Sequence, residues 1–185
     1  MVAAGDNVRL DGMEIRPFAA GDAPTLHAAV RESIASLSRL FPWCSADYAL
    51  ADAEARVAAC IAAWRDGSEY PFGIFAHGRD ARLLGCVGLN RLDGAARSAN
   101  LGYWTGEAHR GRGIATQAAA WTAAFGFREL GLARIEIVVL PENAASQRVV
   151  GKLGAVREGL VPDRIVLDGH RVDAVLFSLS AGTPA

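Results

Sequence analysis

The spacing of apolar residues predicts the elements of the first third of the chain. Alternating apolar side chains from Met13 to Phe18 predict a short strand. Apolar residues then recur every three or four positions from Leu26 to Leu37 and again from Leu50 to Trp64, which is the period of an α-helix. Asp22, just before the first helical stretch, is typical of a helix start, and Gly67 is typical of a helix end.

The middle third of the chain contains short apolar runs bounded by turn residues. The runs cover Pro71–His77, Arg82–Leu92 and Arg97–Thr105, and the sequences Gly78-Arg79-Asp80 and Asp93-Gly94 separate them. This pattern predicts three strands joined by hairpins, which makes them antiparallel neighbours in a sheet.

The last third of the chain returns to a helical period and then alternates again. The expected order is helix, strand, helix, strand, strand. The corresponding ranges are 113–131, 135–139, 143–154, 155–167 and 172–179. Asn143 is a typical N-cap for the second of these helices, and the turn Asp168-Gly169 joins the last two strands. Glu136 is expected on the opposite face of its strand from Ile135 and Ile137.

The complete order of elements predicts an α+β fold with one central sheet. Seven strands and four helices are expected, and the sheet is mixed but mostly antiparallel, with one β-α-β crossover in the second half. A chain of 185 residues has the usual size of one domain. We therefore expect a single domain over residues 8–180, with residues 1–7 and 181–185 as flexible termini.

Composition and charge exclude several classes of partner. Nineteen basic and twenty acidic residues give a formal net charge of −1, which argues against binding to nucleic acid or to an anionic membrane. No apolar stretch reaches the ~18 residues of a membrane span, and the first residues lack the pattern of a signal peptide. Cys44, Cys60 and Cys86 are too widely spaced for a disulfide framework and suit a reducing cytosol, so we expect a cytoplasmic protein. The histidines are scattered without metal-site spacing, and no metal is expected.

A glycine-rich stretch after Trp104 carries the clearest chemical signal. Gly111 and Gly113 stand between a predicted strand and a predicted helix, and both allow a positive φ and close approach of a ligand to the backbone. The helix start beyond them leaves amide N–H groups unpaired at the positive end of the helix dipole. Arg110 and Arg112 add positive charge. The stretch is therefore a candidate site for a phosphate or pyrophosphate.

Two other kinds of nucleotide-binding loop do not fit this stretch. A Walker loop requires GxxxxGK[ST], and the pair Gly151-Lys152 is followed by Leu153. A Rossmann fingerprint requires a third glycine where Thr116 stands, and a parallel βαβ context in place of hairpin-joined strands. A pyrophosphate loop of another kind is left, and its alternative is a glycine-rich turn without a ligand.

The loop resembles that of a known family, the GCN5-related N-acetyltransferases (GNAT). Their motif, Arg/Gln-x-x-Gly-x-Gly/Ala, is matched in full by Arg110–Ala115. Further segments resemble the Rim-type branch, which includes the ribosomal-protein N-acetyltransferases, and the resemblance extends over roughly residues 8–180. These segments are Met13–Pro17, Leu101–Trp104, Pro141–Ser146, Lys152–Gly154 and Asp168–Asp173.

The resemblance implies a twisted GNAT sheet and transfer of an acetyl group from acetyl-CoA to a primary amine. In that fold the strand before the loop separates from the strand that ends near Leu140, and the pantetheine arm lies between them. Trp104 and Thr105 would offer backbone groups to that arm. The residues whose amides would hold the pyrophosphate are Arg110, Gly111, Arg112, Gly113, Ile114 and Ala115.

The resemblance also implies candidates for the chemistry at the thioester. Many GNAT enzymes use a tyrosine in the helix after the fifth strand, and none of the tyrosines of this chain lies there; they are Tyr48, Tyr70 and Tyr103. The Rim-type branch has Asn-x-x-Ser instead, so Asn143 would form a hydrogen bond with the cofactor arm. Ser146 would donate a proton to the departing sulfur or hydrogen-bond to it. The alternative is a plain N-cap followed by an ordinary first-turn serine.

The general base is open at this point. Glu107, just before the loop, is a candidate that acts directly or through water, and its alternative is a solvated carboxylate. Some Rim-type relatives place an acid in the strand after the last helix, where this chain has Ile165, with Asp163 and Glu158 nearby. A water chain without a single base is a further alternative. His109 is expected at the surface.

The acceptor is expected to contact the break between the first two helices. Phe41 and Trp43 are candidates to bind it, and the alternative is that they belong to the core. Asp47, Asp52 and Glu54 make this segment acidic, which suits a cationic amine. We expect the α-amine of a protein or peptide as the acceptor. A small amine is the alternative within enzymes, and a CoA-binding sensor or scaffold without catalysis is the alternative of another class. A monomer or a homodimer is expected.

Overall fold

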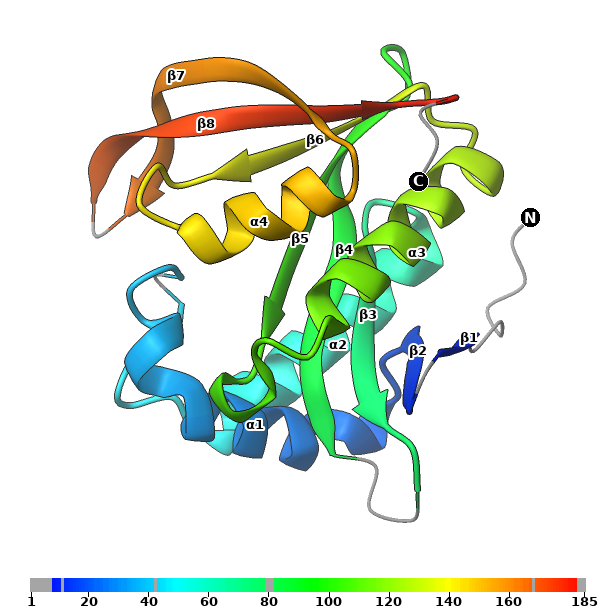
Figure 1. Cartoon of the computed structure of the whole chain (residues 1–185). Coiled ribbons are helices and arrows are strands. Elements are labelled where there is room, and N and C mark those ends of the chain that lie inside the picture. The colour runs from blue at the N-terminus through cyan, green and yellow to red at the C-terminus, as the bar shows by residue number, and fades with distance from the viewer. Residues whose placement is uncertain (1–7, 11, 42, 79–81, 168, 183–185) are drawn as a thin grey trace.

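Eight strands form one sheet in the order β1-β2-β3-β4-β5-β6-β8-β7, as the computed structural model of the chain shows (Figure 1). The structure describes residues 8–10, 12–41, 43–78, 82–167 and 169–182. The strands are β1 Val8–Leu10, β2 Met13–Pro17, β3 Tyr70–Ala76, β4 Leu83–Asp93, β5 Ser98–Thr105, β6 Arg134–Val139, β7 Val156–Leu167 and β8 His170–Ser180. The expected flexible termini at residues 1–7 and 183–185, the turn residues Arg79, Asp80 and Asp168, and Pro42 lie outside the described residues.

The first five strands pair with their neighbours in antiparallel fashion, which confirms the predicted hairpins of the middle third. Leu89 of β4 lies opposite both Tyr70 of β3 and Leu101 of β5, and so fixes the register of three strands. The sheet has one strand more than the seven predicted. The additional strand, β1, has three residues and turns back at Gly12, whose φ is 75°. Three residues are too few to show a period in the sequence.

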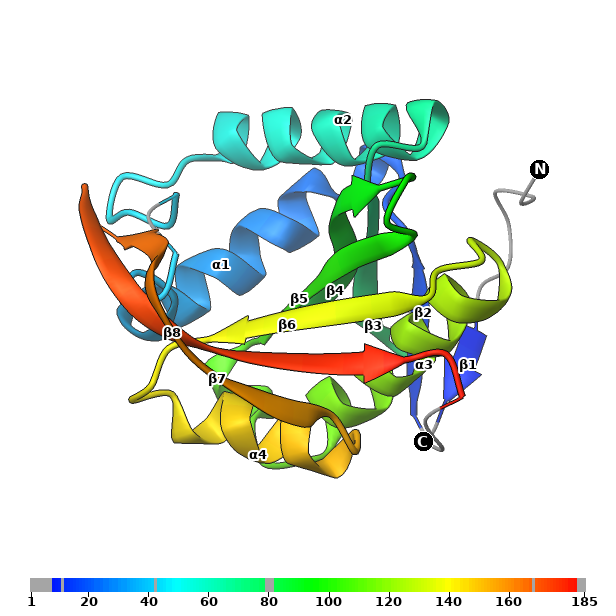
Figure 2. The same cartoon turned by 90° about the horizontal axis from the view of Figure 1, so that it is seen from above.

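A single parallel pair joins the two halves of the sheet, as the predicted β-α-β crossover requires. β5 and β6 pair only from Ser98 opposite Arg134 to Asn100 opposite Glu136. Beyond Asn100, β5 continues to Thr105 alongside β4, whereas β6 continues alongside β8. The two central strands therefore diverge after a short paired segment, and the views in Figures 1 and 2 agree on this arrangement.

Four α-helices cover the two faces of the sheet, and their number confirms the prediction. They are α1 Ala23–Leu37, α2 Leu50–Asp66, α3 Ile114–Arg128 and α4 Ala144–Lys152. One buried cluster joins α3 and α4 to the sheet through residues such as Ala118, Phe125 and Val150. A second cluster joins α1 and α2 to the opposite face through residues such as Val30 and Val57. Figure 2 shows the two pairs of helices on opposite sides of the strands.

Two local expectations about the first helices are only partly correct. α1 begins directly after Asp22, as predicted, but the Asp22 carboxylate does not cap α1. It accepts hydrogen bonds from Arg16 at 2.7 and 2.8 Å and from the backbone N–H of Ala19 at 2.7 Å. Gly67, with a φ of 73°, ends α2 as expected. Leu50, the first residue of the predicted apolar stripe, is exposed, because it lies in the first turn of α2, before the helix reaches the core residue Ala53.

No helix in the described part of the chain is long and apolar enough to cross a membrane.

Candidate active site

The loop between β5 and α3 presents backbone amides at the start of a helix. A short 3₁₀ helix, Glu107–His109, opens the loop, and Gly113 is the N-cap of α3 with a φ of 78°. Gly111 has a φ of 76°, a conformation that glycine adopts readily and other residues adopt with strain. A Cβ added at Gly111 would meet no atom within 4 Å, so the space above the loop is open. This is the geometry that a bound phosphate or pyrophosphate requires.

The remaining residues of the predicted loop lie where the sequence placed them. Arg110 and Arg112 are exposed, and neither forms an ion pair within the part of the chain that the structure describes. Ile114 and Ala115 begin α3 and are half-buried. Two exposed arginines without an ion pair among the described residues therefore precede the first turn of α3, and both can pair with an anion.

The end of β5 leads directly into this loop. Trp104 and Thr105 lie on the segment that β4 pairs and β6 does not, because the β5–β6 pairing stops at Asn100. Among the described residues, the backbone groups of 101–105 that face β6 have no strand partner. Such groups can hydrogen-bond an extended ligand in the way that one strand bonds to another.

The first turn of α4 faces the same segment of β5. Asn143 is the N-cap, as predicted, and its Oδ1 accepts the backbone N–H of Ser146 at 3.0 Å. The Nδ2 of Asn143 makes no hydrogen bond within the described residues. The N-cap role therefore occupies one end of the amide and leaves the other end free for a ligand.

A tyrosine that sequence reasoning set aside lies against Ser146. The Tyr103 hydroxyl lies 2.8 Å from the Ser146 Oγ, across 43 residues of sequence. Burial raises the pKa of Tyr103 to about 12, and the hydrogen bond with Ser146 opposes that shift. Tyr103 is not in the helix where the family's tyrosine lies, so the sequence does not suggest it as a residue of this site. The signal in the sequence that could have pointed to Tyr103 is its place in the segment Leu101–Trp104, which resembles the Rim-type branch.

Glu107 and His109 lie at the start of the loop. Glu107 is exposed, and its backbone N–H donates to the Oγ of the buried Ser33 at 3.1 Å. The expectation that His109 lies at the surface is only partly correct, because the residue is half-buried and its Nδ1 is buried without a partner among the described residues. Burial, together with the positive charges of Arg112 and Arg82, lowers the pKa of His109.

Three aromatic rings line the connection between α1 and α2. Phe41 is half-buried and packs against the core, whereas Trp43 is 47 % exposed. Their ring centroids are 5.6 Å apart, and Trp43 lies 5.9 Å from the buried Tyr48. Of the two predicted acceptor-binding residues, Trp43 is thus the more exposed, and Phe41 serves partly as core.

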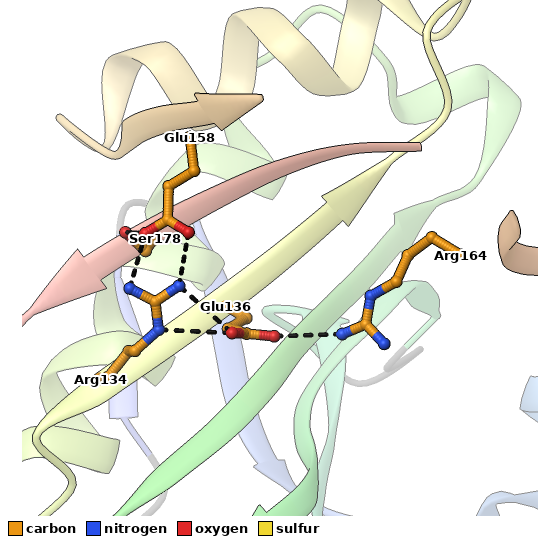
Figure 3. Close-up of polar contacts among 5 residues, drawn as sticks. All are labelled: Arg134, Glu136, Glu158, Arg164 and Ser178. Atoms are coloured by element: carbon orange, nitrogen blue, oxygen red, sulfur yellow. Dashed lines mark hydrogen bonds and ion pairs between the residues drawn. The ribbon is translucent and has the colours of Figure 1, made fainter. Parts of the chain in front are cut away.

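An ion-pair cluster lies on the face of β6 opposite the buried Ile135 and Ile137. Figure 3 shows its residues. Arg134 binds Glu158 at 2.6 Å and Glu136 at 3.2 Å. Arg164 binds the other oxygen of Glu136 at 3.1 Å, and the Ser178 hydroxyl donates to Glu158 at 2.6 Å. The prediction that Glu136 points away from the core is confirmed.

The same cluster contains Glu158, a candidate for the general base. Glu158 lies in the strand after the last helix, where some relatives carry an acid. The hydrogen bonds from Arg134 and then from Ser178 lower the pKa of Glu158 to about 2, and burial opposes this shift. A carboxylate with so low a pKa is a weak proton acceptor, because a base works best with a pKa near the working pH.

Among the described residues, no group of three or more His, Cys, Asp or Glu side chains is arranged so that it could hold a metal ion.

Comparison with known proteins identifies the family. The model of the acetyltransferase (GNAT) domain family matches residues 13–156, so this chain belongs to the GNAT family. The relative named Probable N-acetyltransferase YjcK, from Bacillus subtilis, is 41 % identical over 113 residues, which cover 58 % of this chain and 62 % of that protein. The [Ribosomal protein uS5]-alanine N-acetyltransferase of Escherichia coli is 27 % identical over 63 % of this chain and 60 % of its own length.

A solved structure agrees with the family. Mycobacterium smegmatis RimJ in complex with CoA-disulfide is 30 % identical, with a TM-score of 0.77 over 91 % of this chain and 82 % of that one. The sequence matches to the two curated relatives span only about three fifths of their lengths, 62 % and 60 %. The expected family and sheet architecture are thus confirmed.

Proposed function

We propose that this protein transfers the acetyl group of acetyl-CoA to the α-amine of a protein or peptide. The observation that carries the proposal is the loop of residues 110–115, whose open amides lie at the end of the β5 segment that β6 leaves unpaired. A pyrophosphate fits the amides and the two free arginines. An extended pantetheine arm fits the unpaired strand edge, and its thioester end would reach Ser146.

The reaction requires a neutral amine and a route for one proton. The amine nitrogen attacks the thioester carbonyl carbon, the new C–N bond forms, and the C–S bond breaks. The nitrogen loses one proton and the sulfur gains one, so the charges balance. In this proposal the Ser146 hydroxyl donates to the departing sulfur, and the Asn143 amide holds the cofactor arm. Glu107, or a chain of water, takes the proton of the amine.

The acceptor is proposed to dock at the connection between α1 and α2. The exposed ring of Trp43 and the half-buried Phe41 would contact the acceptor, and Asp47 is exposed on the same connection. A cationic N-terminus is attracted by both a carboxylate and an aromatic face. The name of the E. coli relative, which acts on the alanine of ribosomal protein uS5, supports a protein α-amine.

The test combines release of the CoA thiol with mass spectrometry of the acceptor. Purified protein is incubated with acetyl-CoA and either peptides that begin with Ala or Ser, the same peptides with a blocked N-terminus, or small polyamines. We expect thiol release and N-terminal acetylation with free peptides alone. Acetylation of polyamines alone would overturn the acceptor, and acetyl-CoA binding without thiol release from any amine would favour the sensor or scaffold.

Ser146→Ala and Trp43→Ala then test the assigned roles. We expect Ser146→Ala to lower kcat by roughly 10- to 100-fold with little change in the KM for acetyl-CoA. Trp43→Ala is expected to raise the KM of the peptide and to leave the KM of acetyl-CoA unchanged. An unchanged kcat in Ser146→Ala would remove the serine from the chemistry.

A further inference from the structure

We propose that Tyr103 is a positioning residue of this site, whose hydroxyl holds the Ser146 hydroxyl in the orientation that serves the departing sulfur. The inference rests on the proposed acetyl transfer and adds a residue to it. It starts from a contact between β5 and α4, the two elements that flank the expected thioester.

The position of Tyr103 follows from the alternation of β5. Ala99 and Leu101 are buried in the core on the α3 and α4 side of the sheet, and Tyr103 packs against the same cluster. Tyr103 lies beyond Asn100, on the segment that β6 does not pair. Its ring therefore extends from the strand edge toward the first turn of α4, where Ser146 lies.

Two side chains fix Ser146 from two directions. The Asn143 Oδ1 accepts the backbone N–H of Ser146, and that bond alone satisfies the helix cap. The Tyr103 hydroxyl lies 2.8 Å from Oγ, where either hydroxyl can be the donor, and it can also donate to the carbonyl oxygen of the same residue at 3.3 Å. The contact with Oγ does not serve the cap, so it constrains the hydroxyl itself.

The direction of this hydrogen bond determines what Ser146 can do. The single Tyr103 hydrogen has two acceptors within reach, and Oγ at 2.8 Å is closer than the carbonyl oxygen at 3.3 Å. A phenol is also a stronger acid than an aliphatic alcohol, which favours Tyr103 as the donor and Ser146 as the acceptor of the pair. With Tyr103 as the donor, the hydrogen of Ser146 is not used within the pair. That hydrogen is then free to point at the sulfur of a bound thioester.

The hydrogen bond from Tyr103 to Ser146 also helps to stabilise the negative charge that develops on the sulfur when the thioester breaks. As the C–S bond breaks, negative charge grows on the sulfur, and the Ser146 hydroxyl donates to it. The Tyr103 O–H then donates to a serine oxygen that gains electron density, which strengthens both bonds of the chain. Tyr103 keeps its own proton, because its pKa of about 12 lies above the value of about 8.5 for an ordinary thiol. Ser146 keeps its hydrogen and only hydrogen-bonds to the sulfur. The proton that the sulfur finally carries is the one that Glu107 or a chain of water took from the amine, and it is returned through water.

The test is Tyr103→Phe, which removes one oxygen atom and retains the ring. We expect kcat to fall by roughly tenfold, with the KM for acetyl-CoA changed less than about twofold. Tyr70→Phe is the matched control, because Tyr70 contacts Trp64 and Phe125 in the core and not Ser146. Its kcat is expected to equal that of the unchanged protein.

A double-mutant cycle separates positioning from a merely structural effect. In the Ser146→Ala protein, Tyr103→Phe is expected to leave kcat unchanged, because the hydroxyl it would orient is absent. Thermal unfolding and the acetyl-CoA Kd of each variant show whether the fold or the cofactor site has changed instead. An equal loss of kcat in both backgrounds, or no loss in either, would overturn the role of Tyr103.

Thiol release by the wild-type protein distinguishes failure of the Tyr103 role from failure of the proposed function. If it releases thiol and Tyr103→Phe behaves like Tyr70→Phe, the inference about Tyr103 fails and the proposed function stands. If the wild-type protein releases no thiol with any amine, the proposed function fails, and the positioning role fails with it.

Discussion

The buried hydroxyl of Ser33 in α1 accepts the backbone N–H of Glu107 at 3.1 Å, across 74 residues of sequence. Ser33 is only 1 % exposed, so this bond is shielded from water. It attaches the first helix of the chain to the start of the loop that precedes α3. The position of the proposed pyrophosphate site thus depends on a helix that contributes no residue to that site.

Replacement of Ser33 by alanine is expected to loosen this attachment. The Glu107 N–H would lose its partner, and a buried unpaired donor costs about 1–3 kcal/mol. We expect the free energy of unfolding to fall by about that amount, and the Kd of acetyl-CoA to rise. Urea unfolding and isothermal titration measure the two effects. Ser36→Ala is the control, because its hydroxyl bonds only the carbonyl of Ser33 within the same helix. Equal effects of the two changes would refute the role of Ser33.

Gly85 permits the close pairing of β4 with the end of β5. A Cβ at this position would overlap the carbonyl oxygen of Trp104 and lie 2.9 Å from the Cα of Thr105. Backbone cannot move aside like a flexible side chain, so we expect Gly85→Ala to lower the free energy of unfolding by about 3 kcal/mol, at the upper end of overpacking effects. Gly94→Ala, in the β4–β5 turn, meets no atom within 4 Å and is expected to change little. Similar unfolding midpoints for both variants would contradict this account.

Gly113 allows a ligand to approach the start of α3. Its φ of 78° makes an alanine strained, at a cost of about 1 kcal/mol, and the added methyl group would stand beside the amides of the loop. We expect Gly113→Ala to weaken acetyl-CoA binding at least about tenfold. Gly169→Ala is matched for strain, with a φ of 77° and no atom within 4 Å, but it lies in the β7–β8 turn. If both variants bind acetyl-CoA equally well, the loop does not hold the cofactor.

The fold could be predicted because its elements depend on local patterns. The alternation of Ile135, Ile137 and Val139 and the glycine at the end of α2 determine those elements without distant contacts. The contact between Tyr103 and Ser146 could not be predicted, because it depends on how α4 packs against β5 after the chain has passed through α3 and β6. Asp22 shows the same limit, since Arg16 takes the carboxylate that the pattern had assigned to a helix cap.

The ion pair between Arg134 and Glu158 predicts a pH-dependent contribution to stability. The pKa of Glu158 is lowered to about 2 in the folded state, so folding favours the charged carboxylate. This contribution is present above the ordinary glutamate pKa of about 4.3 and is lost as the pH falls toward about 2. Both side chains are 33 % exposed, so screening by water limits the contribution to about 1 kcal/mol.

We expect Glu158→Gln to lower the free energy of unfolding by that amount at pH 7 and by clearly less at pH 3, in urea titrations. Glu142→Gln, at an exposed residue without a side-chain bond among the described residues, is the control and should show no such difference. A loss in Glu158→Gln that is the same at both pH values would mean that the side chain contributes by packing and not by its charge.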